Sequence, residues 1–429
     1  MPSGLEFPGN AVAVLEERTS TTMKETVKRF KTKLFGLKRL RRFIRWGESA
    51  TFARELADFL NNLKTSVEDP RVGVELVSSF YEADHGVLGN CDDSSGHVGD
   101  LFRYDAKDLF VSYASRCDDK EWLADLVLRL IRKDDYGVRD SLLNCAAEYL
   151  PESAMRRMVE HLWVSAEKES DEYGKRHFFL LVEALARQLK DAPLFEKARI
   201  TAWGGPSTAA CIDIAQVYLE SGDAKTALSW LERIPAEETF KAYEKNRLLL
   251  EVYGKLGYRE KQTEIAWRIF RCSRSEITLA TLLEIIGEGE REQVIAGEAQ
   301  AILREELLSY PDTYFLISVG RMVEAADYLL ARAEQLNGDF YDSLLPLADA
   351  MEKDDRMLVA SVIYRALLDS ILRRAQSKHY SHGVRYLKKL DRMSGSVSDW
   401  LGIISHANYL AGLRQAHGRK FAFWGRYEK

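Results

Sequence analysis

The chain has 429 residues, of which 46% are hydrophobic and 30% charged, and its formal net charge is -5 at pH 7. This length exceeds what a single compact core usually fills, so we expect two domains or an elongated repeat array. The small negative charge predicts no general attraction to nucleic acid or anionic lipid, and such binding would need a local patch. The sequence has no run of about 18 apolar residues, which argues against a membrane-spanning helix.

The first residues and the cysteines together favour a cytoplasmic protein. Residues 1–22 contain Pro, Gly and a Ser/Thr run without sustained periodicity, which is typical of a disordered leader. Their short apolar piece, AVAVL, follows no basic residue and is shorter than a signal-peptide core. The five cysteines are widely spaced and never form a C-x-x-C pair, so we expect free thiols rather than disulfides or a zinc site.

A strongly basic amphipathic helix is predicted over residues 24–45. Its apolar residues recur at intervals of three and four, as on one helix face: Val27, Phe30, Leu34, Leu37, Leu40 and Ile44. The ten Lys and Arg residues of the segment are opposed by one acid, Glu25. This charge indicates a candidate phosphate-binding surface for nucleic acid or anionic lipid, formed by Lys38, Arg39, Arg41, Arg42 and Arg45.

The same basic segment also has a structural interpretation. Its apolar stripe would pack on the rest of the protein, and its cations would pair with acidic neighbours such as Glu48, Glu55 and Asp58. In the functional interpretation, Phe30, Phe43 or Trp46 would pack or stack against the ligand. Because the aromatic residues match the spacing of a core stripe, we favour the structural interpretation.

The stretch GNCDDSSGHVGDLF at 89–102 carries several groups that could do chemistry. An EF-hand loop does not fit, because placing Gly96 at its sixth position puts Cys91 first, where an oxygen ligand is needed. Asp92 and Asp93 lie among Ser and Gly, not in the apolar surroundings that raise the pKa of a catalytic carboxyl. Asp and Ser in such places commonly cap the next helix. We interpret the stretch as a turn and cap, with a metal, ligand or catalytic site as the less favoured alternatives.

From about residue 207 the helical pattern becomes regular. In AACIDIAQVYLESGDAKTALSWLERIP, a turn at Gly222 separates two helical stretches, and Ala227 lies in the second. Small residues at such positions let paired helices approach, as in a tetratricopeptide-like repeat of about 34 residues. The segment VGRMVEAADYLLARA is a second copy, with Gly320 and Ala325 in the corresponding places. The sequence therefore predicts an all-α fold, an α-solenoid of helix-turn-helix pairs.

Several motifs resemble an uncharacterised bacterial α-helical family, and the C-terminal part is similar to the region downstream of SWIM zinc domains. The motifs are DDSSGHVGDLF at 92–102, KDDYGVRDSLLNCAAEYL at 133–150, KHYSHGVRYLKKL at 378–390, DW at 399–400 and HANYLAGLRQAHGRKFAFW at 406–424. The resemblance implies a fold and no particular activity. A SWIM zinc module needs a C-x-C pair followed by C-x-H, and this sequence has neither. Zinc-dependent binding of nucleic acid is therefore not expected.

No catalytic or cofactor motif stands out in the sequence. His379 and His382 are three residues apart, whereas a metalloprotease helix needs histidines four apart with a glutamate beside the first. Nucleophile-elbow, phosphate-loop and dinucleotide-binding glycine patterns are lacking, and GEGERE at 287–292 reads as a glutamate-rich turn. We expect a protein that is not an enzyme and needs no metal or other cofactor.

These observations predict a leader at 1–22, an N-terminal helical domain at 23–205 and a tetratricopeptide-like repeat domain at 206–429. The aromatic residues near the C-terminus, Phe421, Phe423 and Trp424, are expected to cap the last repeat. We expect an interaction scaffold that binds a protein or peptide on its repeat surface. The alternative is a protein that contacts nucleic acid or an anionic membrane through the basic helix 24–45.

Overall fold

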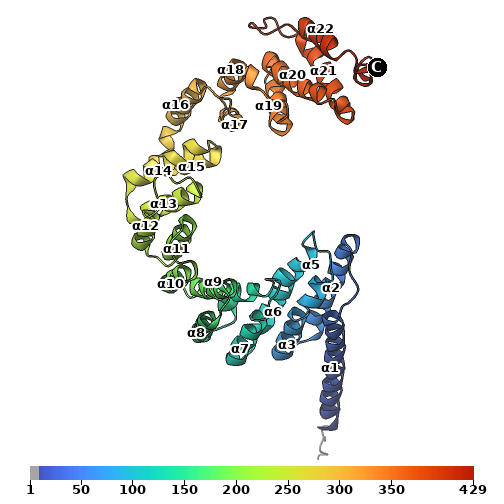
Figure 1. Ribbon diagram of the computed structural model, residues 1–429, viewed down its shortest axis with the longest axis vertical. Coiled ribbons are helices and arrows are strands. Elements are labelled where there is room, and N and C mark those ends of the chain that lie inside the picture. The colour runs from blue at the N-terminus through green and yellow to red at the C-terminus, as the bar shows by residue number, and fades with distance from the viewer. Residues whose placement is uncertain (1–8) are drawn as a thin grey trace, which may run out of the picture. The chain divides into compact units, whose positions relative to one another are not determined.

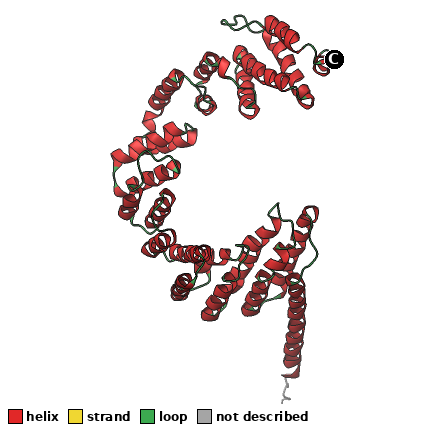
Figure 2. Cartoon of the chain, in the orientation of Figure 1, coloured by secondary structure: helices red, strands yellow, loops and turns green. Residues whose placement is uncertain are grey.

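The computed structural model of the chain describes residues 9–429, and side chains from Lys24 onward. These residues are helical almost throughout and contain no β-strand (Figure 2). An isolated parallel bridge between Ile44 and Cys91 is their nearest approach to a sheet. The predicted all-α class is therefore confirmed. Within the described range, no helix combines the length and the hydrophobicity needed to cross a membrane.

The helices form two compact units, of which the first ends at Lys241 and the second covers Ala242–Lys429. Those of the first unit (Figure 1) are α1 Gly9–Lys38, α2 Trp46–Ser66, α3 Pro70–Tyr81, α4 Asp84–Leu88, α5 His97–Asp100, the π-helix η1 Leu101–Ala106, α6 Lys107–Ala114, α7 Lys120–Ile131, the 3-10 helix η2 Asp140–Glu148, α8 Glu152–Lys168, α9 Glu172–Gln188, α10 Ala192–Trp203, α11 Thr208–Glu220 and α12 Ala224–Leu231.

The second unit contains α-helices joined by short turns and three brief 3-10 helices. In chain order they are α13 Ala242–Leu256, α14 Arg259–Cys272, α15 Glu276–Ile286, η3 Glu288–Glu290, α16 Arg291–Arg304, α17 Tyr310–Ser318, α18 Met322–Ala331, η4 Ala333–Gln335, α19 Tyr341–Lys353, α20 Met357–Arg374, η5 Ser377–His379, α21 Tyr380–Ser394, α22 His406–His417 and α23 Phe421–Tyr427.

In both units the helices pack mainly against their neighbours in the sequence. In the first unit α8, α9, α10, α11 and α12 contact one another in succession. In the second unit α13 packs on α14, α14 on α15, and α19, α20 and α21 follow in the same way. Packing between consecutive helices is the arrangement of an α-solenoid, in which each pair buries its apolar faces on the next. This part of the fold prediction is also confirmed.

Helices α11 and α12 form the helix pair predicted from the regular sequence pattern. Gly222 has a φ of +94°, in the left-handed region that favours glycine, so the chain reverses there at little cost. Asp223 then caps α12 by accepting a hydrogen bond from the backbone amide of the third helical residue. Ala227 is fully buried. The pair α17 and α18 repeats this pattern, with a φ of +77° at Gly320 and a fully buried Ala325.

A run of aromatic rings contributed by α2, α3 and η1 lies in the core of the first unit. Phe59, Phe80 and Phe102 stack in succession, with ring centroids 6.0 and 4.6 Å apart. Gly73 of α3 allows Tyr113 of α6 to approach so closely that a Cβ at Gly73 would lie 2.3 Å from its ring. These contacts join four helical segments, α2, α3, η1 and α6, into one core.

At the end of the chain, two aromatic residues of α23 contact the preceding helices, Phe423 contacting α21 and Trp424 contacting α22. The ring of Phe423 lies edge-on to that of Tyr380, with centroids 5.7 Å apart. The indole nitrogen of Trp424 donates to the carbonyl oxygen of His417 at 2.9 Å. Phe423 and Trp424 are thus buried as a cap would require, whereas Phe421 is 80% exposed.

The basic segment 24–45 is not one continuous helix, and here the prediction was wrong. Helix α1 ends at Lys38, because the chain beyond it pairs with a distant loop and becomes extended. The amide of Ile44 donates to the carbonyl of Asn90, and the carbonyl of Ile44 accepts from the amide of Asp92, both at 2.8 Å. The apolar spacing continues past Lys38 even though the helix does not.

Two predicted boundaries also differ in position from those of the structure. Helix α1 begins at Gly9, inside the segment 1–22 for which the sequence predicts a disordered leader, and residues 1–8 lie outside the described residues. The first unit ends at Lys241, whereas the sequence places a domain boundary after residue 205. Because α10 and α11 pack against each other, helix contacts continue across that position.

Candidate functional site

The five residues of the candidate phosphate-binding surface lie at the end of α1 and in the extended segment that follows. Two of them form ion pairs within the first unit, Lys38 with Glu82 and Arg42 with Glu48. The guanidinium of Arg39 lies 4.0 Å from the ring centroid of Phe35. Arg39, Arg41, Arg42 and Arg45 are all exposed. The structure therefore places these cations on one short stretch of surface and neutralises two of them in part.

Exposed aromatic rings accompany these cations. Phe35 is 54% exposed, Phe43 57% and Trp46 66%, whereas Phe30 is buried at 8%. The expectation that the aromatic residues of this segment share the core stripe is right for Phe30 and wrong for Phe43 and Trp46. The physical reason is that the helix ends at Lys38, after which the side chains no longer follow the helical period. We call residues 35–46 the basic aromatic segment.

The acidic loop at 89–102 has the predicted role of a turn and cap. The carboxylate of Asp93 accepts hydrogen bonds from the amides of Val98 and Gly99 in α5, at 2.9 and 2.8 Å. The carboxylate of Asp92 accepts from the hydroxyl of Ser94. Gly96 has a φ of +77°, which closes the turn. Asp92 and Asp93 thus accept hydrogen bonds from groups of their own loop and the helix that follows it.

The motif at 133–150 contributes Arg139 to a buried ion pair. Asp84, fully buried, accepts from Nε and Nη2 of Arg139 at 2.7 and 2.6 Å, and Arg139 is 4% exposed. Nη1 of Arg139 donates to the carbonyl of Leu130 at 2.9 Å. Further along the motif, burial raises the pKa of the Cys145 thiol to about 11, so this thiol stays protonated at neutral pH. Through Arg139, the motif thus stabilises the interior of the first unit.

The histidine pair singled out in the sequence lies at the surface of the second unit. The rings of His379 and His382 are 6.4 Å apart, and Nδ1 of His382 lies 3.0 Å from a guanidinium nitrogen of Arg385. The positive charge of Arg385 beside this nitrogen disfavours the binding of a metal cation there. In the part of the chain that the structure describes, no group of three or more His, Cys, Asp or Glu side chains is placed to hold a metal ion.

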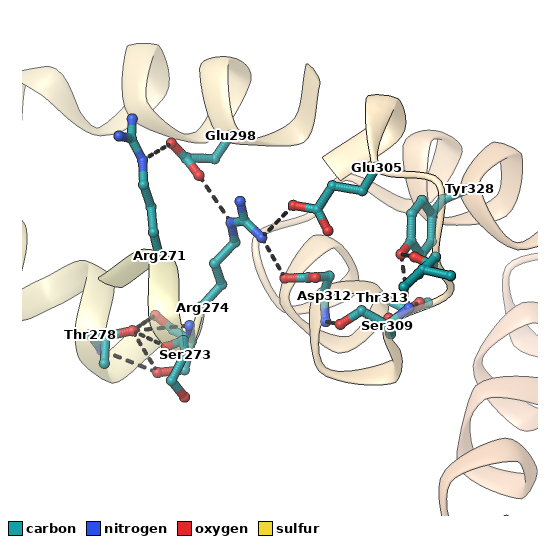
Figure 3. Close-up of polar contacts among 12 residues, drawn as sticks. Arg271, Ser273, Arg274, Thr278, Glu298, Glu305, Ser309, Asp312, Thr313 and Tyr328 are labelled. Carbon is teal, nitrogen blue, oxygen red and sulfur yellow. Dashed lines mark hydrogen bonds and ion pairs between the residues drawn. The ribbon is translucent and has the colours of Figure 1, made fainter. Parts of the chain in front are cut away.

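Sequence reasoning missed an ion-pair network in the second unit that centres on Arg274 (Figure 3). Its Nε lies 2.9 Å from Glu298, and its Nη1 lies 2.9 Å from Asp312 and 3.1 Å from Glu305. Arg271 also pairs with Glu298 at 2.9 Å. Burial alone would lower the pKa of Arg274, but the surrounding carboxylates raise it overall. The charges compensate one another and link α14, α16 and α17, so the network is structural.

A second feature that the sequence did not reveal is a pocket of about 1050 Å³ in the second unit. It lies between the end of α18, helix α20 and the segment 401–404, and Arg365 and Asp369 of α20 are among its lining residues. Arg365 is 6% exposed, and burial lowers its pKa. Desolvation raises the pKa of Asp369, whose carboxylate accepts a hydrogen bond from the hydroxyl of Tyr409 at 2.7 Å.

Comparison with known proteins identifies a family and no activity. A family model described as a family of unknown function, DUF6880, matches residues 12–202 and 175–426. No curated protein and no solved structure matches the chain. Since the two matched ranges cover nearly all of the sequence, the chain belongs to the DUF6880 family of unknown function.

Proposed function

We propose that this protein is a non-catalytic interaction scaffold that binds a peptide or protein partner on its helical-repeat surface. The observation that carries the proposal is the packing of consecutive helices, α8 to α12 in the first unit and α13 to α15 and α19 to α21 in the second, as in tetratricopeptide-like arrays. Such packing leaves a long surface open to a partner, where a compact bundle would bury it. The Gly222 and Gly320 turns, each followed by a buried alanine, agree with the tetratricopeptide-like pattern.

The proposal includes a setting for the scaffold. All five cysteines are free, which agrees with a reducing cytoplasm. In this proposal the protein is bacterial and cytoplasmic. Its C-terminal part corresponds to the region that follows SWIM zinc domains but lacks their zinc-binding module.

A partner capture tests the scaffold proposal. The tagged protein is incubated with lysate of its native host, in nuclease-treated and untreated halves, and washed at increasing salt. A stoichiometric protein partner recovered in both halves and at high salt is expected, because an apolar groove contact responds weakly to screening. Recovery that collapses with nuclease would contradict the proposal.

A second candidate function rests on the exposure of Phe43 and Trp46 beside Arg41 and Arg45. Cations that contact phosphates and aromatic rings that stack or insert are the groups by which proteins bind nucleic acid strands or anionic lipid surfaces. In this candidate function, the basic aromatic segment contacts phosphate groups and the helical array serves as its support.

Charge reversal tests this second candidate. The variant Arg41→Glu/Arg42→Glu/Arg45→Glu is compared with Lys24→Glu/Lys28→Glu/Lys33→Glu, an equal change of charge on exposed residues of α1. Binding to single-stranded RNA and to anionic vesicles is measured over a range of salt. Phosphate binding by the segment predicts a loss for the first variant that is much larger than for the second, with a shallower salt slope. Equal effects of the two variants would refute a specific role for the segment.

A further inference from the structure

We propose that the pocket beside Arg365 binds a carboxylate, supplied by the carboxyl terminus of a peptide segment, and that residues 400–404 move to admit it. This inference deepens the scaffold proposal, on which the peptide nature of the ligand rests. The carboxylate site itself rests on the geometry of Arg365.

Arg365 has one occupied edge and one empty edge. Its Nη1 donates to the carbonyl oxygen of Ile404 at 2.8 Å. Its Nε and Nη2 are buried and have no hydrogen-bond partner. The guanidinium carbon lies 4.5 Å from the ring centroid of Trp400 and 4.6 Å from that of Tyr409. Aromatic rings stabilise the positive charge but do not replace the hydrogen bonds that two buried N–H donors require.

The same protein shows what this guanidinium edge binds elsewhere. In Arg139, Nη1 donates to a main-chain carbonyl, and Nε with Nη2 hold the Asp84 carboxylate. In Arg199, Nε and Nη2 hold the Glu183 carboxylate at 2.9 and 2.6 Å. Arg365 repeats the arrangement of Arg139 on Nη1, but its other edge lacks the carboxylate. A bidentate carboxylate is therefore the group that completes the site.

Residues 400–404, which cover Arg365, form a strained and partly exposed backbone segment that can move. Nε and Nη2 of Arg365 are out of reach of solvent, so a ligand meets them only after this segment shifts. Leu401 has a φ of +47° and Gly402 one of +82°, so a leucine is held in the left-handed region that disfavours it. Leu401 is 65% exposed and Ile404 56% exposed, although both are apolar. The segment is thus strained and only partly packed.

The size and charge of the pocket favour a peptide end over a polyanion. Its volume of about 1050 Å³ is at the upper end of pockets for small molecules, which leaves room for several residues. Asp369 and Glu334 also line it and would repel additional negative charge. Arg373 lines it too but pairs with Asp339 at 3.2 Å. Arg365 thus remains to bind an anion in a pocket that also contains carboxylates, so a ligand with a single carboxylate next to uncharged groups fits it.

The test uses the 429-residue chain and an array of short peptides of varied sequence, each synthesised with a free carboxyl terminus and as the amide. Succinate and acetate serve as small carboxylate probes. We expect peptides to bind as free acids and not as amides, and Arg365→Met to weaken binding about tenfold or more. Arg365→Lys keeps the charge but not the two-pronged edge, so it also weakens binding. Arg373→Met removes the same charge from an exposed position in the same pocket and leaves binding within about twofold.

Thermal unfolding separates a binding role from a structural one. Because Arg365→Met removes two unsatisfied donors, we expect its melting temperature to equal or exceed that of the parent. Equal binding of acids and amides, unaffected by Arg365→Met, overturns the carboxylate site and leaves the scaffold proposal standing. Binding of succinate or acetate through Arg365 without any peptide keeps the carboxylate site and overturns the peptide ligand. Binding of no acid, with a lower melting temperature for Arg365→Met, overturns the whole inference.

Discussion

Replacing Asp84 by alanine should destabilise the first unit strongly, because it leaves a buried arginine without its partner. Arg139 is 4% exposed, and Asp84 supplies both of its carboxylate hydrogen bonds, at 2.7 and 2.6 Å. After the substitution, only the Leu130 carbonyl would still accept from the guanidinium among its present partners. Removing one member of such a pair typically costs about 3–5 kcal/mol. The double variant Asp84→Ala/Arg139→Met also removes the charge, so most of that loss should be recovered.

Hydrogen exchange measured by mass spectrometry is the appropriate assay, because it reports local opening in a chain whose two units need not unfold together. Peptides from α4 and from the turn before η2 should lose protection in Asp84→Ala. Peptides of the second unit should remain unchanged. A loss of less than about 1 kcal/mol in Asp84→Ala, or a double variant less stable than the single one, would contradict this prediction, since neither fits a buried charge that depends on its partner.

Two further predictions concern local structure in the first unit. The hydroxyl and amide of Thr226 lower the pKa of Asp223, so its stabilising effect is present above the unfolded-state pKa and is lost as pH falls through the folded-state pKa. Thermal melts should therefore show a loss of about 1 kcal/mol for Asp223→Ala at pH 7 and a smaller loss for Asp223→Asn, which keeps one capping oxygen but not the charge. In acid the parent should lose part of its advantage over Asp223→Ala. Equal losses for the two variants at pH 7 would contradict this. Gly73→Ala should unfold more easily because its Cβ meets Tyr113 at 2.3 Å, while Gly47→Ala, which meets nothing within 4 Å, should gain up to about 1 kcal/mol in urea titrations. Equal stability changes in these two variants would contradict the close packing of α3 on α6.

The parts of the fold that sequence reasoning found are those encoded by neighbouring residues. A Gly-Asp turn with a small residue a few positions later is a local pattern, and α11 with α12 follows it. The cap formed by Asp93 is local as well, since it acts on amides five and six residues further on.

The parts that sequence reasoning missed depend on contacts between distant residues. Helix α1 ends early because Ile44 pairs with the backbone around Cys91. The sequence of the basic segment alone does not predict that contact. The candidate pocket likewise depends on Arg365 meeting Ile404 and Trp400, which follow it by more than thirty residues. An arginine in an amphipathic helix looks the same in the sequence whether its charge is solvated, paired or buried without a partner.

Site-directed photo-crosslinking tests the central claim, that the protein is a scaffold which binds its partner on the repeat surface. A photoreactive amino acid is placed either at Leu401, 65% exposed at the pocket, or at Trp46, 66% exposed in the basic aromatic segment. After irradiation in the native host, we expect a discrete protein adduct from the Leu401 position that disappears when Arg365→Met is added. Adducts formed from the Trp46 position alone, and containing nucleic acid or lipid, would contradict it.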